Sequence, residues 1–170
     1  MLDIRRIVVP TDFSADAVRA YEVAIQLARS FGAEITLLHC YQINPGGISP
    51  YGIAMPVALD QELQDAVRRQ LAEWREKADS EGVTVQTRLL SLTPSVGIAQ
   101  CVEETGADLI VMGTRGLAGI QHVMLGSVAE RVVRKAPCPV MTVRHPKHEF
   151  VIPFEQLPTR RLLDSTETDA

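Results

Sequence analysis

The sequence has few cysteines, no strong excess of either charge and no long apolar run. Its 170 residues include three cysteines, an odd and widely spaced set, so neither a disulfide framework nor a CxxC metal site is expected. The formal net charge of −4 does not favour a general nucleic-acid or anionic-membrane surface. No apolar run approaches the roughly 20 residues that span a bilayer, and the first residues lack the apolar core and cleavage site of a signal peptide. We therefore expect a cytoplasmic protein with no membrane span and no nucleic-acid partner.

Two common phosphate-binding motifs are absent as well. No GxxxxGK[ST] segment occurs, and the lysines Lys77, Lys135 and Lys147 all lie outside the glycine-containing segment described below. No GxGxxG follows the first expected strand, which disfavours a dinucleotide-binding fold of the usual kind. Any phosphate site in this chain must therefore be built in another way.

Strand-like and helix-like segments alternate along the chain. The strand-like runs are almost continuously apolar, which is typical of a parallel sheet covered on both faces. Right-handed crossovers between such strands give a doubly wound α/β sheet. Ser14 is the expected N-cap of the first helix, and Gly32 its expected end. We expect strands at residues 4–10, 34–41, 83–90, 108–113 and 139–143, and helices at residues 15–31, 59–81, 94–105 and 127–135.

The character of the sequence changes after residue 144. Residues 145–170 contain three prolines, show no convincing periodicity and end in a polar segment. We therefore predict one domain at residues 1–144, followed by a C-terminal extension at residues 145–170 that is partly disordered.

Two segments reach the place where open α/β sheets bind ligands, beyond the carboxyl ends of the strands at the switch in strand order. The first is Pro10, Thr11 and Asp12. As an acceptor, the Asp12 carboxylate is a natural partner for a sugar hydroxyl or a base amine. An Asx turn that orders the loop is the alternative role of Asp12, and the two roles are compatible.

The second segment runs from Gly113 to Ser127 and suits a phosphate group. Its glycines allow successive backbone N–H groups to converge on an anion, and the following helix N-terminus favours negative charge. Ser127 can add a hydroxyl donor and Arg115 a charged one. The alternative is a turn glycine followed by an N-cap serine, which needs no ligand.

The glycine spacing in this segment matches a known pattern, G-x2-G-x9-G-[S/T], through Gly113, Gly116, Gly126 and Ser127. Together with residues 10–14, 108–113 and 136–140, it resembles the universal stress protein family of the nucleotide-binding type, over about residues 1–144.

The resemblance implies a five-stranded parallel sheet of order 3-2-1-4-5 with helices on both faces, an adenine nucleotide alpha hydrolase-like fold. It also implies a homodimer that binds ATP, alone or with Mg²⁺. Arg115 is not a fixed position of the motif. The remaining assignments that the resemblance implies are Asp12 at the ribose or adenine, Cys40 in the base pocket, Met112 and Gly113 beneath the nucleoside, and Gly116, Gly126, Ser127 and Val128 at the phosphates.

The last strand supports a dimer on independent grounds. In that strand order it is an apolar edge strand, and an uncovered edge of this kind is an aggregation hazard. Pairing with a symmetry mate would remove the hazard, and coverage by the C-terminal extension is the competing explanation. The residues of the expected interface are Val140, Met141, Thr142 and Val143.

The leading interpretation is an ATP-binding regulatory protein of the stress-response type, whose affinity for an unknown protein partner changes with nucleotide state. One alternative is a slow ATPase, or a phosphoryl or nucleotidyl transferase. Asp12, Ser127, Arg115 and His122 would then have to supply the catalytic groups, which is a thin set for fast chemistry. The other alternative is a dimeric interaction module that binds no nucleotide.

Overall fold

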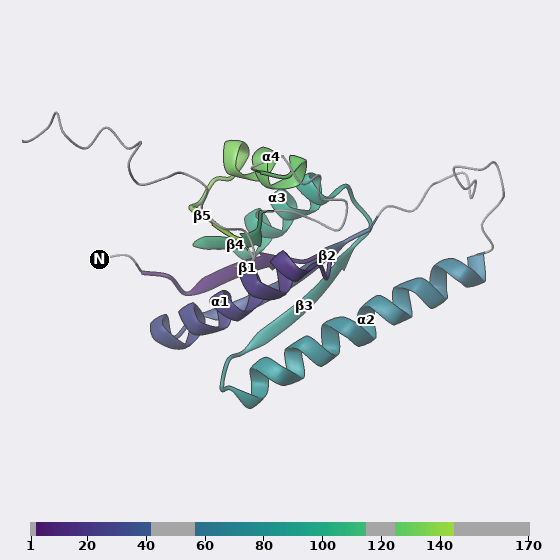
Figure 1. The fold of residues 1–170 in the computed structure, drawn as a ribbon, viewed down its shortest axis with the longest axis horizontal. Coiled ribbons are helices and arrows are strands. Elements are labelled where there is room, and N and C mark those ends of the chain that lie inside the picture. The colour runs from purple at the N-terminus through teal and green to yellow at the C-terminus, as the bar shows by residue number, and fades with distance from the viewer. Residues whose placement is uncertain (1–2, 42–56, 115–124, 145–170) are drawn as a thin grey trace, which may run out of the picture.

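The computed structural model describes residues 3–41, 57–114 and 125–144, with residues 57–60 described by their backbone alone. Arg115, Gly116, His122 and the extension at residues 145–170 lie outside the described residues. Strands and helices alternate along the chain (Figure 1). The elements are β1 (Arg6–Pro10), α1 (Ala15–Phe31), β2 (Glu34–Cys40), α2 (Val57–Ser80), β3 (Val85–Leu90), α3 (Pro94–Thr105), β4 (Leu109–Gly113), α4 (Ser127–Lys135) and β5 (Val140–Val143).

The five strands form one parallel sheet of order β3-β2-β1-β4-β5. β1 lies at the centre, where Ile7 is opposite Ile35 of β2 and Leu109 of β4. The chain passes outward from β1 through β2 to β3, and then crosses back to β4. This crossover creates the switch in strand order between β1 and β4, and the expected fold class is confirmed.

Two apolar layers sandwich the sheet, with α1 and α2 over one face and α3 and α4 over the other (Figure 1). Successive side chains of a strand point to opposite faces. Val9 therefore packs in the cluster beneath α1 and α2, whereas Val8 packs in the cluster beneath α3 and α4. Both side chains are fully buried, as a doubly covered parallel sheet requires.

The ends of α1 are those that the sequence predicts. The Ser14 hydroxyl accepts a hydrogen bond from the Ala17 N–H, at 3.3 Å. Gly32 adopts φ 67°, in the left-handed region, and its N–H bonds the Ala28 carbonyl. Both helix termini are thus capped by the local chemistry of their residues.

Two strands begin two residues later than expected. β1 begins at Arg6 rather than residue 4, because the N–H groups of Arg5 and Arg6 both donate to one Asp108 carboxylate oxygen, at 2.9 Å each. β3 begins at Val85 rather than residue 83, because the Val83 N–H bonds back to Ala78 of α2, at 3.1 Å. In both places, side-chain or helix-end hydrogen bonds compete with the sheet ladder. Among the described residues, no helix is long and apolar enough to cross a membrane.

Candidate functional site

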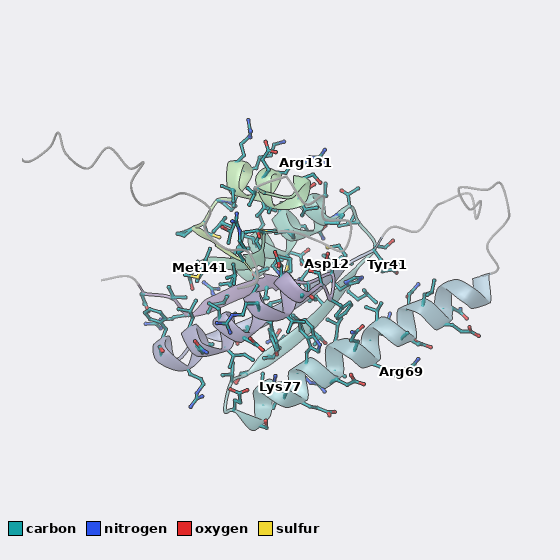
Figure 2. All side chains as sticks on the ribbon, in the orientation of Figure 1. Asp12, Tyr41, Arg69, Lys77, Arg131 and Met141 are labelled. Carbon is teal, nitrogen blue, oxygen red and sulfur yellow. The ribbon has the colours of Figure 1, made fainter. Side chains whose placement is uncertain are left out.

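The two segments that the sequence singles out meet at the carboxyl edge of the sheet. β1 ends at Pro10 and β4 ends at Gly113, and the two strands are neighbours that run in the same direction. Figure 2 shows Asp12 on the same side of the molecule as Tyr41, which follows β2, and away from Met141 on β5. This edge is the switch point at which doubly wound sheets bind ligands.

Three side-chain hydrogen bonds order the turn between β1 and α1. Thr11 Oγ1 accepts from the Phe13 N–H at 2.9 Å, and Asp12 Oδ1 accepts from the Ser14 N–H at 3.1 Å. Ser14 then caps the helix through Ala17. The predicted Asx turn at Asp12 is therefore present. A carboxylate has about four acceptor positions, so this bond does not exhaust what Asp12 can accept.

The glycine-containing loop after β4 is closed at its base. The Gly126 N–H donates to the Thr114 carbonyl oxygen at 2.7 Å, so the two ends of the loop lie side by side. The Thr114 N–H donates in turn to the carbonyl oxygen of Val143 on β5, at 3.0 Å. The start of the loop is therefore tied both to the start of α4 and to the sheet.

The N-terminus of α4 corrects one interpretation of the sequence. Gly126 is the N-cap, with φ −68° and ψ 155°, and Ser127 is the first residue of the helix. Ser127 is therefore not the N-cap. The alternative that explains the Gly126-Ser127 pair by an N-cap serine, without a ligand, is wrong. Because the cap is a glycine, it makes no side-chain hydrogen bond to the first N–H groups of α4, whose partial positive charge favours an anion. Val128 packs at the margin of the core beneath α3 and α4.

A hydrogen bond that the sequence did not predict joins the second segment to the first turn of α1. The Thr114 hydroxyl donates to Asp16 Oδ2 at 2.9 Å, and both residues are buried. Asp16 lies in the first turn of α1, four residues after Asp12. From the sequence alone, an acidic residue there indicates only a favourable interaction with the helix dipole. Its partner is 98 residues away in the sequence, so no local pattern could have identified the pair.

Met112 and Gly113 end β4 in different environments. Met112 is buried in the core beneath α3 and α4. Gly113 faces α1, where an added Cβ would lie 2.9 Å from the Asp16 carbonyl carbon and 3.0 Å from the Ala17 nitrogen. The close approach of β4 to α1 is therefore sufficient reason for a glycine at position 113.

Cys40 ends β2 with its thiol against α3. An added Cβ at Gly97 would lie 2.5 Å from Cys40 Sγ, so this glycine leaves room for the thiol. Burial raises the pKa of the Cys40 thiol to about 12, with a smaller contribution from nearby Cys101. The thiol is therefore uncharged at neutral pH and behaves as a small apolar group. Cys40, Cys101 and Cys138 are all free thiols.

No group of three or more His, Cys, Asp or Glu side chains that could hold a metal ion occurs within residues 3–41, 61–114 and 125–144.

Comparison with known proteins agrees with the sequence pattern. The model of the universal stress protein family matches residues 3–144. A universal stress protein of Methanocaldococcus jannaschii is 36% identical over 148 residues, with 85% of each chain covered. A universal stress protein of Bacillus subtilis is 30% identical over 146 residues, covering 82% of this chain and 98% of that protein.

A solved structure adds a ligand to the comparison. It is a universal stress protein in complex with cAMP, and it superposes with a TM-score of 0.62 at 26% identity. The match covers 84% of this chain and 98% of that one.

Proposed function

The chain belongs to the universal stress protein family, and from this premise we propose that it binds ATP at the carboxyl edge of β1 and β4. The observation that carries the proposal is the buried Asp16–Thr114 hydrogen bond, at 2.9 Å. This bond ties the base of the glycine-containing loop to the first turn of α1, which directly follows the Asp12 turn. A homologue in complex with cAMP supports an adenine nucleotide as the ligand.

The described residues fit the two ends of a nucleotide. The Asp12 carboxylate can accept from ribose hydroxyls or the adenine amine. The N-terminus of α4, at Gly126 and Ser127, whose glycine cap makes no side-chain hydrogen bond, can donate backbone N–H groups to phosphate oxygens. Arg115 and Gly116 would complete the phosphate contacts, with Met112 and Cys40 beside the nucleoside. Mg²⁺ would arrive with the phosphates, since the described residues contain no group of three ligating side chains for it.

We propose that bound ATP regulates partner binding rather than undergoing rapid turnover. Fast phosphoryl transfer normally combines carboxylate-held Mg²⁺ with a Lys or Arg side chain and a group that orients the nucleophile. In the described parts of the two loops, residues 11–14, 114 and 125–126, the charged side chains amount to Asp12 alone. The alternative of a slow ATPase would depend on His122 and Arg115, and it predicts rapid turnover that is lost when His122 is replaced.

Calorimetric titration of nucleotide-free protein with Mg–ATP tests the proposal directly. We expect saturable binding of about one ATP per chain, weakened by the Asp12→Ala substitution because a polar contact to the nucleoside is lost. Titrations with AMP and cAMP, together with analysis of any nucleotide released on denaturation, identify the preferred ligand. Folded, nucleotide-free protein that binds none of these nucleotides would contradict the proposal and favour the interaction module.

We also propose that the protein is a homodimer paired through β5. β5 is an edge strand, Met141 is 39% exposed on it, and Val133 of the adjacent α4 is 50% exposed. An uncovered apolar edge is a template for strand pairing, and a two-fold axis would pair β5 with its own copy.

The Thr142→Pro substitution should convert such a dimer to a monomer without disturbing the sheet. The carbonyl oxygens of Pro139 and Val143 both accept hydrogen bonds from the β4 side, so alternation directs the N–H of Thr142 to the side of β5 away from β4. Proline removes that donor. Sedimentation velocity measures the change, and Thr142→Val, which keeps the N–H, is the matched control. A wild-type monomer, or a Thr142→Pro dimer, would exclude pairing through this edge.

A further inference from the structure

The turn between β1 and α1 contains the only non-glycine residue with a positive φ in the part of the chain that the structure describes. Phe13 has φ 63°, in the left-handed region, where the Cβ of an L-residue is crowded against the backbone. Such a conformation persists where surrounding contacts determine it, and it occurs preferentially at functional sites. The contacts of Phe13 therefore show what fixes the turn.

Two aromatic rings hold the Phe13 ring. His39 of β2 is stacked against it, with ring centroids 5.0 Å apart and an interplanar angle of 25°. Trp74 of α2 meets it edge-on, with centroids 5.5 Å apart and an interplanar angle of 89°. Both arrangements are favourable for aromatic pairs. The Phe13 ring is thus held between a strand and a helix that lie far from it in the sequence.

The two holding rings are themselves fixed. His39 Nδ1 lies 2.8 Å from the Thr11 carbonyl oxygen, which can only accept, so Nδ1 carries the proton. Tyr21 of α1 stacks on Trp74, with centroids 5.0 Å apart, and its hydroxyl donates to the Trp74 carbonyl oxygen at 2.8 Å. Burial raises the pKa of the Tyr21 hydroxyl, so this donor keeps its proton. We call His39, Phe13, Trp74 and Tyr21 the aromatic clamp.

The aromatic clamp acts on both neighbours of Asp12. Thr11 is bonded through its carbonyl oxygen to His39, and through its N–H to the Leu38 carbonyl oxygen at 2.8 Å. On the other side, the hydrogen bond from the Ser14 N–H to Asp12 Oδ1 spans Phe13, so its geometry depends on the Phe13 backbone. The direction of the Asp12 carboxylate therefore follows from where the clamp holds Phe13.

We propose that Phe13, held by His39 and Trp74, is a positioning residue that orients the Asp12 carboxylate toward the nucleotide, so that packing of α2 sets nucleotide affinity. The inference rests on the proposed nucleotide binding. Phe13 acts through Asp12 and makes no contact with the ligand itself. Trp74 belongs to α2. The contact between its indole ring and the Phe13 ring is the route by which α2 influences the site.

Four variants test this role by calorimetry with Mg–ATP, at a temperature where each is folded. Phe13→Leu and Trp74→Leu remove the ring contacts and should each raise Kd about tenfold. Phe13→Tyr keeps the ring and should bind as the wild type does. Ile25→Ala, in the same core but further along α1, should lower Tm at least as much as Phe13→Leu while leaving Kd unchanged. Kd rather than stability is thus the readout that separates positioning from packing.

A double-mutant cycle with Asp12→Ala identifies the route of the effect. If Phe13 acts through Asp12, then Phe13→Leu should change Kd by less than about twofold once Asp12 is replaced. Wild-type affinity in the Phe13→Leu single variant overturns the inference, and so does an undiminished tenfold loss in the Asp12→Ala background. Failure of the wild type to bind ATP is a separate outcome, which removes the proposed function and this inference with it.

Discussion

The Gly126→Val variant should lose ATP binding, with Kd raised by at least ~100-fold (about 2.7 kcal/mol), while keeping its fold. The backbone of Gly126 has φ −68° and ψ 155°, a conformation that any L-residue adopts. Its two hydrogen bonds, to Thr114 and from Glu130, are made by the main chain and survive the substitution. Valine is a poorer N-cap than glycine by no more than about 1 kcal/mol. The valine side chain would nevertheless stand beside the N–H groups that are proposed to hold the phosphates.

Calorimetry measures the loss of ATP binding, and thermal unfolding measures the loss of stability, so the two measurements separate these effects. Gly126→Ala should fall between glycine and valine in affinity, because a single methyl group fills less of the phosphate space. Lys135→Val, at the opposite end of α4, is the control for a β-branched residue in this helix and should leave Kd near the wild-type value. Unchanged affinity in Gly126→Val would mean that the phosphates lie away from α4.

The elements of the fold were predictable because their signals are local. The cap at Ser14 and the left-handed Gly32 depend on residues within one helical turn, and both were predicted correctly. The N-terminus of α4 was harder to predict. A Gly-Ser pair can place either residue at the cap, and the choice depends on the Gly126–Thr114 hydrogen bond, which joins the two ends of the loop.

The contacts that organise the site could not be predicted, because they join residues that are far apart in the sequence. Phe13 and Trp74 meet only once α2 has packed on the sheet. Asp16 and Thr114 meet only once β4 is seated beside β1. The residue types at these positions do not by themselves indicate such contacts. An aromatic residue on an amphipathic helix predicts core packing, and an acidic residue in the first turn of a helix predicts an interaction with the helix dipole. The sequence therefore predicted where the candidate site lies, but not the contacts that join its described residues.

Substitution of Gly113 should be the most destabilising change at the site. We expect Gly113→Ala to lower the free energy of unfolding by about 2 kcal/mol and Gly113→Val by about 3 kcal/mol or more, as overpacking does. The new Cβ would lie 2.9 Å from the Asp16 carbonyl carbon and 3.0 Å from the Ala17 nitrogen. These are backbone atoms of α1, so trimming the Asp16 side chain would not relieve the contact. Loss of chain entropy in the unfolded state offsets only about 0.4–1 kcal/mol.

Gly97→Ala is the matched comparison, because it adds the same methyl group against a different kind of neighbour. Its Cβ would lie 2.5 Å from Cys40 Sγ, a shorter distance than at Gly113, but a thiol can rotate away whereas a helix backbone cannot. Alanine also gains about 1 kcal/mol over glycine within a helix. Thermal unfolding should therefore show Gly97→Ala near the wild-type Tm and Gly113→Ala lower by roughly 4–8 °C. Equal Tm values for the two variants would mean that β4 and α1 separate easily. The Asp16–Thr114 hydrogen bond would then be too weak a constraint to fix the loop after β4 against α1.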